Sequence, residues 1–290
     1  MPSAMSRSTA TYSPRRLSAE PSLPMALEFV PAVLSRSVAS LRLLLEDDAV
    51  DLELASCIVA LDPGLTFAVL QLANGGSSPF ATPVWQLPSA LVAVGREALQ
   101  TLLQCAPRVE SPGMARRRLT TLARNAVVRA SIAQLLAREL GCCNPRKSFL
   151  SGLLLETPDL VGSSYPHTAI DRNRLLAVML ASLPAPVVNA AMARKHAMKN
   201  VPEPLAAITM LSEVLRCKAC NDVASDFVVA QYWCCWPEYT MIQRHALAER
   251  CAELALWAGE NLYRLEPWDF LARLERRCPW ELPDERACDR

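Results

Sequence analysis

The chain has 290 residues, of which 51% are hydrophobic, and its formal net charge at pH 7 is +1. This length can bury a substantial core, while the near-neutral charge gives no global attraction to nucleic acid or to an anionic membrane. No apolar run reaches the ~20 residues that a membrane-spanning helix needs, and the start lacks the apolar core of a secretory signal peptide.

The composition favours helices over strands. There are only 9 glycines, Ala and Leu dominate, and strict alternation of apolar and polar residues is rare. The 11 cysteines are scattered and odd in number, which is typical of reduced thiols in the cytoplasm rather than of a disulfide framework. We therefore predict a cytoplasmic, all-α protein.

The first part of the chain is predicted to hold four helices. Residues 1–24 are rich in Ser, Pro and Arg, and we interpret them as a disordered lead-in. The first helix is predicted over 25–46, with Pro31 as an alternative start, and three helical patterns follow within residues 51–103.

Two short motifs separate these three patterns. Asp62 is a favourable N-cap, and Pro63 loses nothing at the first helical position because its missing donor would have no partner there. Asn74-Gly75 is predicted to end the middle helix with a left-handed C-cap. We expect both motifs to be structural corners.

The second part begins after a short breaker at residues 109–113. A long helix is predicted over 114–140 with Gly141 as its C-cap, and Asn144-Pro145 opens the next helix. Residues 157–168 are interpreted as irregular because they contain two prolines and Gly162. Later helices are predicted at about 171–183, 186–199, 204–217, 222–235, 238–260 and 267–277.

Three short motifs lie within the stretch 51–103, and their residues are Asp62, Pro63, Leu65, Thr66, Leu70, Leu72, Ala73, Asn74, Leu87, Ala90, Leu91, Val94 and Gly95. Through these residues the stretch resembles the HDOD domain family, which comprises degenerate relatives of the HD metal-dependent phosphohydrolases. The resemblance implies a multi-helix bundle of two subdomains. On this basis we expect an N-terminal helical subdomain at 25–108, an HD-like helical subdomain at 114–277 and a polar tail at 278–290.

The resemblance also places the metal ligands of the HD enzymes on this sequence. Those enzymes use a His, then an adjacent His-Asp pair and a later Asp, because an ion that activates water needs several N or O ligands in one pocket. Here Asn125 stands at the first His, Leu155 at the second and Glu156 at the Asp. We interpret Glu156 as a solvated charge at a helix end. The expectation is therefore no metal, no cofactor and no catalysis.

Cysteine and histidine offer few other candidates. Cys217 and Cys220 form a CxxC pair for which zinc or redox chemistry is conceivable, but a chance pair in a helical region is the favoured interpretation. The three histidines, His167, His196 and His245, are far apart and have no ligand spacing. An aromatic cluster is explained best by core packing, and it comprises Tyr232, Trp233, Trp236 and Tyr239.

A basic segment lies in the long helix, with no acid between Glu110 and Glu139. Two pairs of its arginines share a helix face and could meet phosphate groups of a nucleotide or nucleic acid. A solvated helix face is the favoured interpretation. The pairs are Arg117 with Arg124 and Arg118 with Arg129.

The leading hypothesis is a non-catalytic regulatory or interaction module in bacterial signal transduction, which acts on an unidentified signalling protein. Members of the family often accompany other signalling modules, and this sequence shows none, so we expect it to act by binding another molecule. One alternative is a residual metal-dependent phosphohydrolase. Another is a regulator that binds a nucleotide or nucleic acid through the helix that carries residues 116–129.

Overall fold

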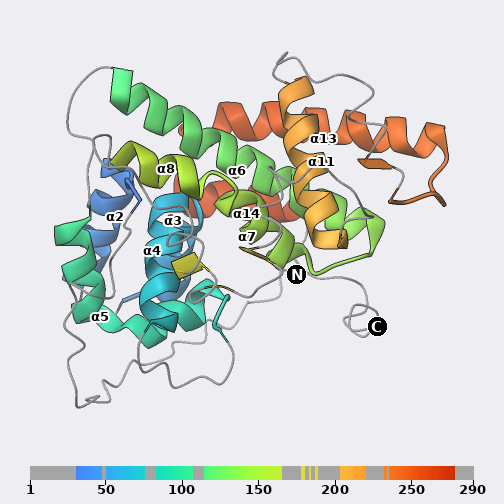
Figure 1. Cartoon of the computed structure of the whole chain (residues 1–290). Coiled ribbons are helices and arrows are strands. Elements are labelled where there is room, and N and C mark those ends of the chain that lie inside the picture. Colours follow the sequence, from blue (N-terminus) through green and yellow to red (C-terminus); the bar gives the residue numbers. More distant parts are fainter. Residues whose placement is uncertain are drawn as a thin grey trace, which may run out of the picture.

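The computed structural model describes residues 31–47, 50–75, 83–106, 114–164, 178–179, 183, 187–188, 203–219, 232–233 and 235–277. The described residues contain no β-strand, so the predicted all-α fold is confirmed. The helices are α2 (Ser35–Glu46), α3 (Leu52–Ala60), α4 (Pro63–Asn74), α5 (Leu87–Cys105), α6 (Met114–Leu140), α7 (Pro145–Leu154), α8 (Thr157–Ser164), α11 (Pro204–Ala219), α13 (Met241–Asn261) and α14 (Pro267–Arg277), as drawn in Figure 1.

Aspartate caps begin both α3 and α4. The side chain of Asp51 accepts hydrogen bonds from two backbone N–H groups in the first turn of α3, at 3.0 Å each. Asp62 Oδ1 accepts from the N–H of Leu65 at 3.0 Å, and Pro63 is the first residue of α4. A carboxylate at this position satisfies N–H groups that have no partner within the helix. The prediction of Asp62 as an N-cap is confirmed.

The corner at Asn74-Gly75 differs from the predicted one. The predicted stop comprised Asn74, Gly75 and Gly76; Gly75 has φ −78° and ψ 145°, which is extended backbone, so the left-handed conformation predicted there was wrong, and Gly76 lies outside the described residues. The Asn74 side chain makes the corner instead. Its Oδ1 accepts from the N–H of Val84 at 2.6 Å, and its Nδ2 donates to the carbonyls of Val84 at 2.8 Å and Leu70 at 3.0 Å. This amide ties the end of α4 to the segment that precedes α5.

Two predicted boundaries were also wrong. α2 begins at Ser35 rather than at residue 25 or Pro31, and the preceding N–H of Leu34 donates to Asp62 Oδ2 at 2.8 Å. Residues 157–164, predicted as irregular, form α8. Pro158 is the second residue of α8, where the backbone N–H has no partner within the helix and proline is tolerated.

Helices α6 and α7 form a closely packed pair. α6 ends at the predicted Gly141, which has φ 60°, and the side chain of Asn144 caps α7. Gly152 allows the two backbones to approach, because a Cβ at this position would lie 2.9 Å from Cα of Ala130. This close approach brings the C-terminal end of α7 against the middle of α6.

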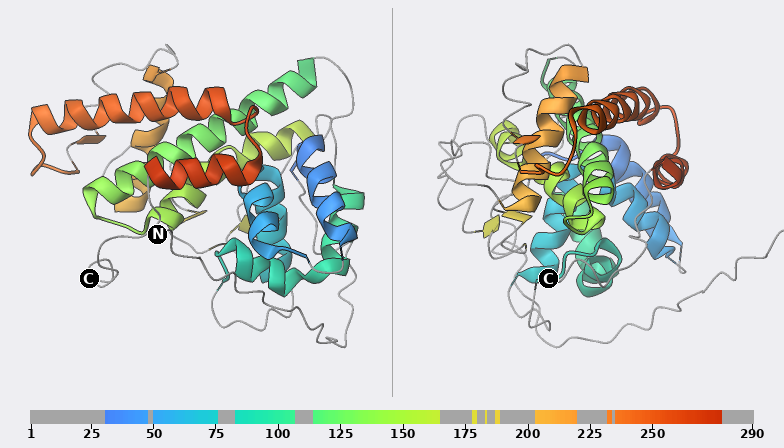
Figure 2. Two further views of the ribbon diagram at one scale, coloured as in Figure 1. Left: turned by 180° about the vertical axis from the view of Figure 1, so that it is seen from behind. Right: turned by 90° about the vertical axis from the view of Figure 1, so that its right-hand side faces the viewer.

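Helix α6 is the central element of the bundle. It contacts α4, α7, α8, α11 and α13, and Figure 2 shows α13 extending along it before the chain turns back into α14, which packs on α3. Residues 126–137 of α6 are all buried. A helix that is enclosed on every side is expected to be apolar all round. Within this stretch Arg129 is the one charged residue.

Two large apolar cores and a smaller one around Leu119 and Leu160 hold the described helices together. The first consists mainly of residues from α2 to α5 and also includes Leu154 of α7 and Val161 of α8. The second joins α6, α7, α11, α13 and α14, and it includes Leu61 at the end of α3. Residues from both predicted subdomains, 25–108 and 114–277, therefore contribute to each core. The predicted breaker at 109–113 lies outside the described residues.

Among the described residues, no helix has both the length and the apolar character that crossing a bilayer requires. The predicted lead-in (1–24) and the tail (278–290) fall outside the described part of the chain. Most residues of the helices predicted at 171–183, 186–199 and 222–235 also lie outside the described part of the chain.

Candidate functional site

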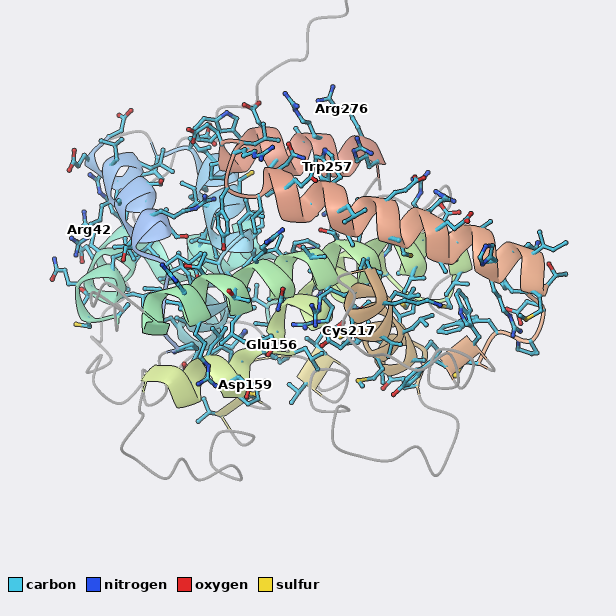
Figure 3. All side chains as sticks on the ribbon, turned by 90° about the horizontal axis from the view of Figure 1, so that it is seen from above. Arg42, Glu156, Asp159, Cys217, Trp257 and Arg276 are labelled. Carbon is cyan, nitrogen blue, oxygen red and sulfur yellow. The ribbon has the colours of Figure 1, made fainter. Side chains whose placement is uncertain are left out.

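The three positions that the family resemblance assigns to metal ligands lie on α6 and just after α7. Asn125 is half-buried on α6, whereas Leu155 and Glu156 are 2% and 4% exposed. The interpretation of Glu156 as a solvated charge was therefore wrong. In Figure 3, Glu156 and Cys217 lie on one side of α6, and Trp257 of α13 lies on the other.

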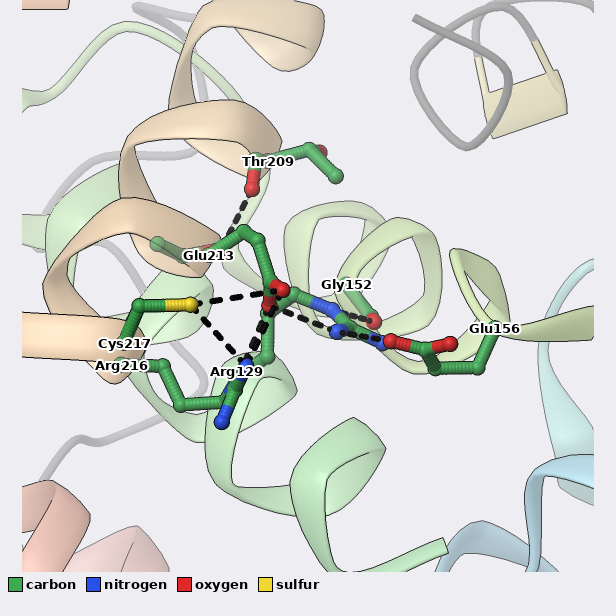
Figure 4. A network of polar contacts seen from close by, with 8 residues as sticks. Arg129, Gly152, Glu156, Thr209, Glu213, Arg216 and Cys217 are labelled. Carbon is green, nitrogen blue, oxygen red and sulfur yellow. Dashed lines mark hydrogen bonds and ion pairs between the residues drawn. The ribbon is translucent and has the colours of Figure 1, made fainter. Parts of the chain in front are cut away.

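Arg129 occupies the space between these elements. Its side chain is fully buried, and its guanidinium group makes three hydrogen bonds, two to α7 and the residues just after it and one to α11 (Figure 4). Nε donates to the carbonyl of Gly152 at 2.7 Å, and Nη1 donates to Glu156 Oε1 at 2.9 Å and to Glu213 Oε2 at 2.8 Å. An internal cation therefore lies between α6, the end of α7 and α11.

Glu213 of α11 extends this arrangement to a second arginine. Arg216 donates from Nε to Glu213 Oε2 at 2.9 Å and from Nη2 to Oε1 at 3.1 Å, and its Nη2 also lies 3.1 Å from the sulfur of Cys217. We call these residues, with Arg129 and Glu156, the Arg129 cluster. Its two guanidinium groups and two carboxylates balance in charge, which reduces the cost of burying them.

Opposing effects set the ionisation of Glu213. Burial opposes its charged form, but the hydrogen bond from Arg216 and the charges of Arg129 and Arg216 outweigh burial. The pKa of Glu213 is lowered to about 2 as a result. Glu213 is therefore an ionised partner of both arginines at neutral pH.

Hydroxyl groups next to the cluster join α7 to α11. Ser151 Oγ and Thr209 Oγ1 lie 2.9 Å apart, and Thr209 also donates to the carbonyl of Leu205 at 2.8 Å. Nη2 of Arg129 is buried and has no hydrogen-bond partner among the described residues. The hydrogen-bond partners of the Arg129 guanidinium group come from α7, its end and α11, and they hold the group in position against α6.

The Arg129 cluster is poorly suited to the chemistry of a metal-dependent hydrolase. A guanidinium group stays protonated at all ordinary pH values, so Arg129 cannot accept a proton from water. The carboxylates of Glu156 and Glu213 already bond to Arg129 and so face a positive charge. Within the described ranges, no group of three or more His, Cys, Asp or Glu side chains is placed to hold a metal ion.

Comparison with known families agrees with the signature of residues 51–103. A family model described as the HDOD domain matches residues 31–172. The chain carries an HDOD domain at these residues. The match runs from the segment before α2 through α8, so it includes Arg129 and Glu156 but not Glu213 of α11.

Solved structures share the fold of this HDOD protein. The crystal structure of the MmoQ response regulator from Methylococcus capsulatus str. Bath is 17% identical, has a TM-score of 0.58, and the match covers 77% of this chain and 99% of that one. A structure of a fragment of the same regulator is 16% identical with a TM-score of 0.55, covering 74% and 94%. No curated protein matches the sequence.

The residues of the HDOD signature lie mainly at positions that stabilise the fold. Leu65 and Ala90 are fully buried, while Leu72 and Leu87 are partly exposed and pack on the first core. Gly95 has φ 73° and ψ 166° and marks a kink inside α5. Only glycine adopts this conformation readily, so the signature glycine sets the direction of the second half of α5.

The arginines proposed for phosphate contact separate into two groups. Arg117, Arg118 and Arg124 are exposed on α6, whereas Arg129 is buried and paired with glutamates. The prediction of Arg129 as a phosphate contact was therefore wrong. The physical reason is that Arg118 and Arg129 share a face of α6 that becomes enclosed along its length, so only the N-terminal half reaches the surface.

The other candidates do not form a site among the described residues. His245 is exposed and pairs with Glu249 at 3.3 Å, while His167, His196 and Cys220 lie outside the described part. Trp233 and Trp236 are buried edge to face with ring centroids 6.2 Å apart, as core packing predicts.

Glu213 was not among the candidates chosen from the sequence, and Arg129 was predicted to lie at the surface although it is buried. A signal for Arg129 existed, because it lies within an otherwise uncharged run from 126 to 137 on α6. A lone charge in such a run indicates a buried, paired group. No comparable local signal identified Glu213 as its partner, since the two residues are 84 positions apart.

Proposed function

We propose that this HDOD protein is a non-catalytic regulatory or interaction module of signal transduction in the bacterial cytoplasm. Its HDOD domain supports a role in signalling, and a protein of similar fold is named as a response regulator. The module acts by binding another molecule rather than by turning over a substrate.

The observation that carries the non-catalytic part of this proposal is the position of Arg129. Its guanidinium group bonds to Glu156, the one carboxylate that remains at the family's metal positions, at 2.9 Å. A divalent cation would have to displace a fixed positive charge from a buried site, and it would find Leu155 in place of an imidazole ligand. Metal binding at this point is therefore unfavourable both in charge and in ligand number.

The test is metal analysis of protein purified without chelator, combined with phosphodiesterase, phosphomonoesterase and nucleotidase assays in Mn²⁺ and Mg²⁺. We expect less than stoichiometric metal and rates equal to those of buffer with the same metal. Losing both imidazole ligands should leave no ion that can lower the pKa of a bound water.

Two variants make this test decisive. Glu156→Gln keeps the size of the side chain and removes its charge, and Glu249→Gln is the matched control at an exposed glutamate of α13. Stoichiometric metal together with hydrolysis that is lost in Glu156→Gln but kept in Glu249→Gln would contradict a non-catalytic module. Metal lost only on replacement of Cys217 or Cys220 would point to a structural zinc, which leaves the proposal standing.

A further inference from the structure

Residues of three chain segments meet beside the N-terminal half of α6, and two of these segments contribute an arginine. Arg36 lies in the first turn of α2, Arg124 lies in the N-terminal half of α6, and Tyr263 follows the end of α13. Arg117 shares the face of α6 that carries Arg124, about 10 Å away along the helix. We call the surface formed by Arg36 and Arg124 at the end of α13, together with Arg117 farther along α6, the basic junction.

Tyr263 and its neighbours hold two of these arginines in place. The guanidinium carbon of Arg36 lies 4.7 Å from the centroid of the Tyr263 ring, and its Nη2 donates to the carbonyl of Leu262 at 3.2 Å. The Tyr263 hydroxyl donates to the carbonyl of Thr120 at 2.9 Å, one turn before Arg124. Arg36 is therefore fixed against the end of α13, and that end is fixed against α6.

The guanidinium group of Arg124 packs against Gly259 of α13. A Cβ at Gly259 would lie 2.8 Å from Nη2 and 3.3 Å from Nε of Arg124, so the guanidinium group packs directly on the backbone of α13 and would have to shift if Gly259 gained a side chain. Fixing a guanidinium before a ligand arrives reduces the entropy that binding must otherwise cost.

The exposed side chains of the basic junction are cationic. Arg36, Arg117 and Arg124 are exposed, and none of them forms an ion pair with another residue of the described ranges. Burial raises the pKa of Tyr263 to about 12, and the charge of Asp62 adds to this rise, while the charges of Arg36 and Arg124 act in the opposite direction.

We propose that the basic junction binds a small phosphorylated ligand through its phosphate groups. The proposal rests on the function proposed above and names the chemistry that the module recognises. Arginine suits this role because its planar group donates two parallel hydrogen bonds to a phosphate. Arg36 covers one face of the Tyr263 ring, so that face is closed to stacking by the bases of a nucleic acid strand.

The probes are a fluorescent nucleoside triphosphate, inorganic tripolyphosphate and a mixed-sequence single-stranded oligonucleotide, with a glutamate peptide as a carboxylate control. Fluorescence anisotropy on the full chain should show saturable binding of the nucleotide that weakens with added salt. Tripolyphosphate should compete for the same site, whereas the glutamate peptide at equal charge should compete at least tenfold less well. Chromatography of the nucleotide after binding separates the two proposals, because hydrolysis would count against the proposed function alone.

Variants then locate the site. Arg36→Ala with Arg124→Ala should weaken nucleotide binding at least tenfold, while Arg138→Ala in the last turn of the same helix should change it less than twofold. Gly259→Ala keeps every charge but displaces the Arg124 guanidinium. It should weaken binding severalfold while the melting temperature stays the same or rises, because alanine favours a helix more than glycine does.

Three results would overturn the proposal. The first is no saturable binding of the nucleotide or tripolyphosphate at low salt. The second is an equal loss in Arg138→Ala and in the Arg36/Arg124 variant, with melting temperatures unchanged. The third is binding of the oligonucleotide at least tenfold tighter than the nucleotide, which would identify a nucleic acid strand as the partner instead.

Discussion

Replacement of Arg129 by Met should reduce the free energy of unfolding by about 3–5 kcal/mol at pH 7, the cost of removing one partner from a buried ion pair. Methionine has a similar length, so the main change is electrostatic. The carboxylates of Glu156 and Glu213 would remain in a site that is almost closed to water, with Arg216 as the remaining cation. The carbonyl of Gly152 would also lose its 2.7 Å hydrogen bond.

The dependence of this loss on pH identifies its origin. In the native protein the pKa of Glu213 lies near 2, so its stabilising contribution is present above the ordinary glutamate value of 4.5 and is lost as the pH falls toward 2. In Arg129→Met the carboxyl of Glu213 loses the charge and the hydrogen bond of Arg129 that help to lower its pKa, so the variant should approach the native protein in stability as the pH falls. Denaturant titrations between pH 7 and pH 4 measure the difference.

Two further variants serve as controls for Arg129. Arg138→Met, at a half-buried position of the same helix, should cost roughly 0.5 kcal/mol or less, as is usual away from buried networks. The double variant Arg129→Met with Glu156→Gln removes one charge of each sign and should recover part of the stability. An Arg129→Met protein as stable as Arg138→Met at pH 7 would show that the buried pairs contribute nothing.

Asp62→Ala should cost about 2–4 kcal/mol, which is more than an ordinary helix cap contributes. Loss of the cap on Leu65 costs about 1 kcal/mol, and the buried N–H of Leu34 would also lose its acceptor, at about 1–3 kcal/mol. Both bonds come from a side chain that is 1% exposed, at 3.0 Å and 2.8 Å. A denaturant titration measures the change.

Asp51→Ala is the matched control, because Asp51 caps α3 in the same way but is exposed. It should cost only about 1 kcal/mol. Burial raises the pKa of Asp62 above its ordinary 3.8, against the hydrogen bonds from Leu65 and Leu34. The folded state therefore binds this proton more tightly, and the native protein should lose stability relative to Asp62→Asn as the pH rises from about 4. Equal losses in the two alanine variants would mean that Asp62 acts only as a cap.

Local signals predicted the helices best. The bounds of α6, α7 and α14 follow from apolar spacing, from Gly141 as a stop and from Asn144-Pro145 as a start. The start of α2 does not follow from local signals, because the backbone N–H of Leu34, just before Ser35, is bonded to Asp62, 28 residues further along the chain. Likewise, the end of α4 depends on the Asn74 side chain bonding to Val84 across a loop.

The candidate site depends on contacts that a sequence shows only indirectly. The family pattern assigned Asn125, Leu155 and Glu156 to two segments, and in the structure these segments, α6 and the end of α7, pack together. It could not show that Arg129 fills the space between them. Arg129 is 27 residues from Glu156 and 84 residues from Glu213 in the sequence, and only the folded chain brings these side chains together. Likewise, the basic junction joins residues of α2 and α6 through Tyr263, which lies 227 positions after Arg36.

The Arg129 cluster also bears on how a metal centre could be introduced at these positions one substitution at a time. Replacing Arg129 first would remove a cation from two buried carboxylates, and placing a histidine at Leu155 first would bring a polar ring to a position that is 2% exposed. We expect each single step to lower stability before a set of metal ligands is complete. Single Arg129→Met and Leu155→His variants as stable as the native protein would contradict this expectation. If both are destabilised, a ligand set at these positions requires substitutions that are made together.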